Sequence, residues 1–302
     1  MPKVFGKYEP SEQLTLRVHF ETDDNSIDSR TLASTLVFLK ETLDEIQREY
    51  GSTKALALQV RPFEKGSFGF PIDLFQYDFQ VLVASLDFSS LNDYVQTLIE
   101  IIKLKIALKG AKAKKVEKND GSELQVVLPD GTRIPATDRA VNIYNNSNVV
   151  NYHINMAGGA LKVDESVKEI KLLDNKGEEV LSLPKTSFEI LEHSESPEPE
   201  AERTRTETVP LNIYQLTFSD RHQWQFFYHG IKISARIKDD VFLVRIEKGT
   251  EKFANGDTLV CDLEIKQIFD NQANTYINQN YTVTKVHRHH SRPEQIEMDV
   301  EV

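Results

Sequence analysis

A succession of short β-type segments fills the last third of the chain and constrains the fold more than any other feature. Turn-forming residues separate the segments, for example Asp239-Asp240 and residues 255–257. Short strands at such spacing are typical of a closed or half-closed antiparallel barrel. We therefore predict a C-terminal β domain over residues 209–302. The segments are LNIYQLTF, WQFFYHG, IKISARI, VFLVRI, TLVCDLEIKQIF and TYINQNYTVTKV.

The first part of the chain predicts an α+β unit, residues 1–110. Residues 14–20 alternate apolar and polar side chains, as a strand with one buried face requires. Apolar residues then recur every three or four positions from Leu32 to Tyr50, which predicts an amphipathic helix capped by Asp28 or Ser26. Two β-type runs follow, so the unit is expected to be strand, helix, strand, strand.

A second helix is predicted over residues 91–108. Its apolar positions cover more than one stripe, and lysines 103, 105 and 109 exclude a membrane span. A helix of this kind buries two sides, either within its own chain or in a subunit interface.

The middle of the chain, residues 111–191, predicts a small α+β or mostly β module. Pro129-Asp130-Gly131 and residues 175–177 have turn chemistry, and Gly158-Gly159 is also expected to form a turn. Residues 192–208 hold six acids and two prolines but no large apolar side chain, so we predict an acidic linker there.

The charge and cysteine content limit the environment and the partners. Lysine and arginine number 36 against 47 aspartates and glutamates, a net charge of −11 that disfavours general binding to nucleic acid and favours basic partners. A single cysteine excludes internal disulfides, and no signal or membrane segment is visible. We expect a protein of the cytoplasm that does not contact a membrane.

No common catalytic or nucleotide-binding motif is present, so we expect no enzyme activity and no cofactor. His287, His289 and His290 are the one metal-like cluster, but no carboxylate or cysteine pattern completes a ligand set, which favours a polar strand end. Cys261 lies in an apolar run and is expected to be a buried core residue.

Aromatic residues are the candidate binding residues. Strand alternation places Trp224, Phe226 and Tyr228 on one face and Phe227 on the other. Exposed aromatic side chains are frequent centres of protein interfaces. We therefore predict a protein-binding role for the first three of these and for Phe68 and Phe70.

Two stretches of the chain carry a resemblance. Residues 25–46 with 60–74, and the ending WQFFYHGIKISARIKDDVFLVRIEKGTEKFANGDTLVCDLEIKQ, resemble the two ends of an uncharacterised family met in bacterial genomes, prophages and other mobile elements. The resemblance implies a role in conflict between phages and their hosts. The size and acidity are compatible with phage anti-defence proteins that coat the Gabija nuclease complex.

These observations lead to one expectation and two alternatives. We expect a non-catalytic, homo-oligomeric protein that binds and occludes a host defence complex. The first alternative is a bacterial sensor or regulatory module whose barrel binds a nucleotide or a single-stranded nucleic acid through Trp224, Tyr228 and the lysines of residues 109–118. The second alternative is a metal-dependent enzyme built around the three histidines.

Overall fold

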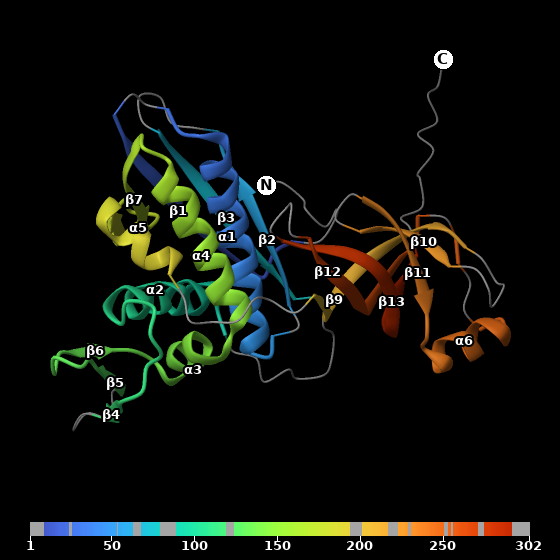
Figure 1. Cartoon of the computed structure of the whole chain (residues 1–302). Coiled ribbons are helices and arrows are strands. Elements are labelled where there is room, and N and C mark those ends of the chain that lie inside the picture. The colour runs from blue at the N-terminus through green and yellow to red at the C-terminus, as the bar shows by residue number, and fades with distance from the viewer. Residues whose placement is uncertain are drawn as a thin grey trace, which may run out of the picture.

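The computed structural model has the predicted α+β class. It describes residues 9–291 except for residues 24–25, 53, 63–67, 79–88, 119–123, 194–200, 217–222, 229–230, 251–252, 255 and 271–274. Six helices and thirteen strands lie in this described part of the chain. They form a helix-covered sheet, a small three-stranded sheet and a closed barrel (Figure 1).

A five-stranded antiparallel sheet is the centre of the first part. Its order is β2-β3-β1-β7-β8. The strands are β1 (Glu12–Thr22), β2 (Ala55–Val60), β3 (Phe68–Tyr77), β7 (Val167–Leu173) and β8 (Glu179–Pro184). Because β7 and β8 pair onto β1, the predicted units 1–110 and 111–191 share one sheet and one hydrophobic core.

Four helices cover one face of this sheet, and α1 and α4 lie side by side on it (Figure 1). They are α1 (Ser29–Glu49), α2 (Leu91–Ala107), α4 (Asn148–Val163) and α5 (Lys185–Glu192). The Asp28 side chain caps α1 as predicted, and Gly51 follows it with a positive φ of 71°. The apolar helix α2 is buried within its own chain, the first of the two predicted possibilities.

The glycine pair Gly158-Gly159 was expected in a turn but lies inside α4, so that prediction is wrong. A Cβ atom on Gly158 would lie 2.5 Å from the backbone nitrogen of Glu192. Glycine here permits α4 and α5 to pack backbone against backbone.

The remaining elements of the first part are a helix that packs against α2 and a small separate sheet. Helix α3 (Asp138–Asn146) leads into α4. Strands β4 (Val116–Lys118), β5 (Leu124–Val127) and β6 (Arg133–Pro135) form the small sheet, which contains the predicted hairpin around residues 129–131. The lysine-rich residues 109–115 connect α2 to this small sheet.

The C-terminal barrel has the order β10-β11-β13-β12-β9 and is closed by pairing of β9 with β10. The strands are β9 (Glu202–Gln215), β10 (Trp224–Tyr228), β11 (Ile231–Ile237), β12 (Thr258–Asp270) and β13 (Thr275–His290). One pairing, β11 with β13, is parallel, so the predicted all-antiparallel barrel needs that correction.

Two further predictions in this region are wrong. Residues 202–208 of the predicted linker belong to β9 and pair along β12. Alternate side chains of this segment have partners on α1 and on β12, which order it as a strand. Residues 194–200 of the predicted linker lie outside the described part. The run VFLVRI forms helix α6 (Asp240–Glu247), not a strand. Asp239 caps this helix by accepting from the amide of Phe242, whose ring is fully buried.

The barrel packs against the sheet face that the helices leave free. Ala57 and Phe75, on β2 and β3, share a hydrophobic core with the barrel residues Leu263 and Ile265. Both sides of the sheet edge at β2 and β3 are therefore covered, and the barrel lies beside that edge (Figure 1).

Candidate functional site

The aromatic side chains predicted to bind a partner on β10 face the barrel interior. Trp224, Phe226 and Tyr228 are 5%, 0% and 8% exposed, whereas Phe227 is 39% exposed. The predicted alternation is confirmed, but the three-residue face is core. The first three side chains therefore do not form an exposed patch, and Phe227 is the aromatic residue of β10 that faces solvent.

Phe68 and Phe70, the other two predicted binding residues, belong to the core of the five-stranded sheet. Phe70 is fully buried, and Phe68 is partly buried with its ring edge against Phe20, 6.1 Å between ring centroids. Neither residue is close in the fold to β10, so the structure does not bring the five predicted residues together.

A different aromatic pair lies on the outer face of the barrel. Tyr214, from β9, is 40% exposed and meets Phe227 edge to face at 5.4 Å between ring centroids. The ladder between β9 and β10 shifts register here, because Gln225 pairs with Gln215 and Phe226 with Ile213. The shift leaves Tyr214 opposite no residue of β10, and such irregularities redirect side chains.

Cationic side chains flank this aromatic pair. Lys232, directly across the ladder from Phe227, places its ammonium group 4.0 Å from the centroid of the Tyr214 ring. Arg236 lies four residues further along β11 on the same face, is exposed, and makes no ion pair with a described residue.

None of the described residues on the outer face formed by the end of β9 with β10 and β11 is acidic. We call this face the outer barrel face. Its residues are Asn212, Tyr214, Gln225, Phe227, Lys232, Ser234 and Arg236. The combination of exposed rings, unneutralised cations and polar side chains can bind a ligand that has flat apolar groups and negative charge.

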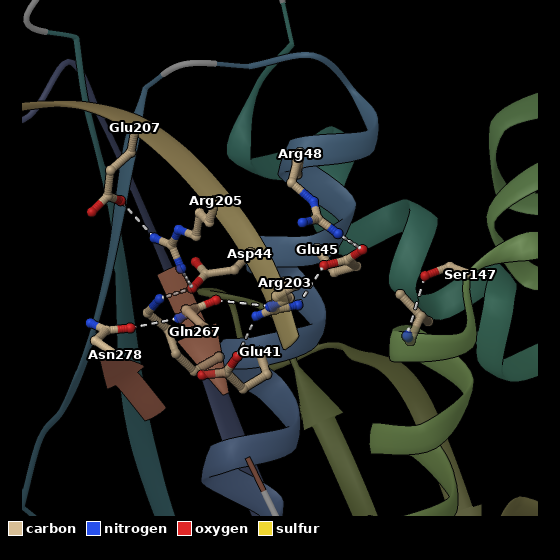
Figure 2. A network of polar contacts seen from close by, with 12 residues as sticks. Glu41, Asp44, Glu45, Arg48, Ser147, Arg203, Arg205, Glu207, Gln267 and Asn278 are labelled. Atoms are coloured by element: carbon tan, nitrogen blue, oxygen red, sulfur yellow. Dashed lines mark hydrogen bonds and ion pairs between the residues drawn. The ribbon is translucent and has the colours of Figure 1, made fainter. Parts of the chain in front are cut away.

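The structure has a second cationic region, where the barrel meets helix α1 (Figure 2). Arg203 and Arg205 extend from β9 toward carboxylates of α1, and both are largely buried. Arg205 lies 2.9 Å from Asp44 and 2.6 Å from Glu207. Arg203 lies 3.1 Å from Glu45.

Further contacts complete the second region. Arg203 also donates to Gln267 on β12 at 2.8 Å, contacts Glu41 at 3.4 Å and stacks on the ring of Tyr276 at 3.8 Å. Each guanidinium thus has partners on two or more elements. This network joins β9, β12 and β13 to the helix layer and leaves little charge free for a ligand.

Burial and pairing set the pKa values in the network. Burial raises the pKa of Asp44, but the charges of Lys40 and Arg205 outweigh it and hold the pKa below its usual value. Burial raises the pKa of Glu41, and the nearby Asp44 adds to the effect. Burial lowers the pKa of Arg205, but Glu207 and Asp44 raise it further, so the guanidinium stays charged.

The histidines at the end of β13 have separate partners. His287 lies 2.7 Å from Asp262 and His289 lies 2.9 Å from Asp257, both across the ladder on β12 or just before it. Within the described ranges, no group of three or more histidine, cysteine, aspartate or glutamate side chains could hold a metal ion. His290 ends the strand.

Cys261 is a core residue, as predicted. It is fully buried, its thiol lies 3.8 Å from the carbonyl oxygen of Val209, and burial raises its pKa well above the usual value. A thiol in this state is a poor nucleophile.

Some residues of the outer barrel face could be predicted from the sequence. Alternation in WQFFY places Phe227 outside, and alternation in IKISARI places Lys232, Ser234 and Arg236 together on one face. Tyr214 could not be assigned in this way, because its position depends on the register shift against β10.

Comparisons with known proteins give no relative. The chain matches no protein-family model, no curated protein and no solved structure. In the described part of the chain, every helix is too short or too polar to cross a membrane.

Proposed function

We propose that this protein is a non-catalytic binding protein whose outer barrel face binds a single-stranded nucleic acid. One observation carries the proposal: the exposed pair Tyr214 and Phe227 lies beside Lys232 and Arg236 on a face whose described residues include no acid. Bases of any sequence stack on aromatic rings, and cations near those rings attract the phosphates between the bases.

The connectivity of the barrel supports this ligand. Three consecutive strands, β9 to β11, are followed by a helix and two more strands, and the last strand lies between β11 and β12. Five-stranded barrels of the OB-fold share this arrangement and bind oligonucleotides on the face of their second and third strands. In this chain those strands are β10 and β11.

The main objection to a nucleic acid as the ligand is the negative net charge of the chain, and the distribution of that charge removes the objection. Residues 202–290 contain 12 lysines and arginines and 11 aspartates and glutamates, so the barrel is close to neutral. The acidity of the chain lies mainly in residues 1–201, which hold 23 basic and 32 acidic residues. Repulsion of phosphates by the net charge of −11 is therefore weakest at the barrel.

Fluorescence anisotropy with a labelled 12-nucleotide DNA or RNA tests the proposal. We expect binding at 50 mM salt that weakens as salt is added, and a loss of about tenfold in affinity for Phe227→Ser, since stacking contributes roughly 1–3 kcal/mol per base. Ile277→Ser is the matched control, because Ile277 is 41% exposed on β13, outside this face. Equal affinity of both variants, or no binding at 50 mM salt, would contradict the proposal.

A second candidate is the binding of a protein partner, in the setting of phage and host conflict that the resemblance implies. Helix α6 favours it, because Val241 and Val244 are 73% and 43% exposed and lie next to each other on a helix turn. We expect Val241→Ser with Val244→Ser to abolish any self-association or partner capture. Light scattering of the protein alone and pull-downs from bacterial lysate check this. A monomer that captures no stable partner would exclude this candidate.

A further inference from the structure

Gln225 lies in the middle of the outer barrel face. It pairs with Ser234 across the ladder to β11, and alternation places it on the same side of β10 as Phe227. The register shift beside it brings Tyr214 of β9 to its other flank. Gln225 is therefore surrounded by the side chains that form the proposed stacking surface.

The side chain of Gln225 has an unmet hydrogen-bonding capacity. Its Oε1 atom is buried and accepts no hydrogen bond from any described residue. A buried acceptor without a donor destabilises the fold, and most such groups in proteins find a partner. The Gln225 side chain is only half-buried and lies beside the two half-exposed rings, so its amide can turn outward and gain a donor from a ligand.

We propose that the Gln225 amide hydrogen-bonds the edge of a base held at Tyr214 and Phe227, and that it selects adenine. This inference rests on the proposed function and names the ligand of the same site. The amide oxygen accepts from the N6 amino group, and the amide NH₂ donates to the ring nitrogen beside it. Glutamine and adenine form this two-bond pair in other complexes.

The other bases fit this amide less well. Thymine and uracil have no amino group, and the O6 atom of guanine would face Oε1 with two acceptors opposed. Cytosine offers an amino group next to a ring nitrogen, but it has the smaller stacking surface. Bases in single strands expose these edges, so the side chain can reach them without opening a duplex.

The test compares two oligonucleotides that differ by one amino group. Both have 8 nucleotides. The first is a run of deoxyadenosine, and in the second every base is purine, which is adenine without its N6 amino group. The wild-type protein is expected to bind the adenine run 5- to 100-fold more tightly. Gln225→Leu is expected to bind both runs with the affinity that the wild type shows for purine.

The controls separate the possible failures. Gln279→Leu removes an exposed glutamine of β13 and is expected to keep the wild-type preference. Equal wild-type affinity for the two runs, or an unchanged preference in Gln225→Leu, would overturn the role of Gln225 while leaving the stacking surface intact. Absence of binding to every oligonucleotide would overturn the proposed function and this inference with it.

Discussion

The barrel has two cationic regions with opposite surroundings. At the contact with α1, Arg203 and Arg205 are 8% and 19% exposed, and carboxylates of two elements neutralise them. On the outer barrel face, Lys232 and Arg236 are exposed and have no carboxylate partner among the described residues. Charge that is buried and paired positions the barrel, whereas charge that is exposed and unpaired is available to a ligand.

The same contrast applies to the aromatic residues. Trp224, Phe226 and Tyr228 fill the barrel, and their removal would act on stability. Tyr214 and Phe227 remain half exposed and contribute less to the core. Substitutions in the two regions should therefore separate into those that change folding and those that change binding.

The largest effect is expected from Arg205→Met. The substitution leaves Glu207 buried without its cation and Asp44 with Lys40 as its one remaining cation among the described residues, and breaking a buried pair in this way costs about 3–5 kcal/mol. Urea unfolding measures the free energy of unfolding. The same change at the exposed position, Arg236→Met, is expected to alter it by less than about 0.5 kcal/mol. Similar losses in both variants would remove the distinction between the two regions.

A second prediction concerns His153, which lies in α4 close to the buried network. Its side chain is 1% exposed, its Nε2 atom has no hydrogen-bond partner among the described residues, and burial together with Arg203 lowers its pKa to about 4. The unfolded chain binds a proton near pH 6.5 and the folded chain does not, so folding becomes less favourable as the pH falls from 6.5 toward 4.

At pH 5 the expected loss from this one group is about 2 kcal/mol relative to pH 7.5. His153→Phe removes the titrating group and should lose that much less stability between the two pH values. Urea unfolding at both values tests this, with His19→Phe, a partly exposed histidine of β1, as the control. The same pH dependence in wild type and His153→Phe would show that the buried histidine is not responsible.

The smallest effect is expected from Arg236→Gln. Loss of one phosphate contact should weaken oligonucleotide binding a few-fold and lower the slope of log affinity against log salt by about 0.7. The free energy of unfolding should not change, because Arg236 is exposed and makes no ion pair with a described residue. An unchanged salt slope would place the phosphates away from β11.

Patterns over short stretches of the sequence predicted the helices and strands whose formation depends on neighbouring residues. The helical spacing from Leu32 to Tyr50, the Asp28 cap and the alternation around Phe227 all appear in the structure. Such patterns could not predict which strands pair when the strands are far apart in the sequence. Residues 202–208 have a polar composition typical of linkers, yet β12 and the carboxylates of α1 order them as a strand.

The candidate site also depends on contacts between distant segments that the sequence patterns did not predict. Composition drew attention to Trp224, Phe226 and Tyr228, but a barrel must fill its interior, and these rings do so. Tyr214 reaches the outer face only through a register shift between β9 and β10. The helical conformation of VFLVRI depends on the Asp239 cap and on burial of Phe242, and β-branched composition alone favoured a strand.

Photochemical crosslinking tests the central claim most directly. A 12-nucleotide single strand carrying 5-bromodeoxyuridine is irradiated with the full-length protein, and the crosslinked residues are located by mass spectrometry. We predict crosslinks at Tyr214, Phe227 and their neighbours on β10 and β11, weakened by added salt. Crosslinks concentrated on the lysines of residues 109–115, or none above those of an unrelated acidic protein, would contradict the account.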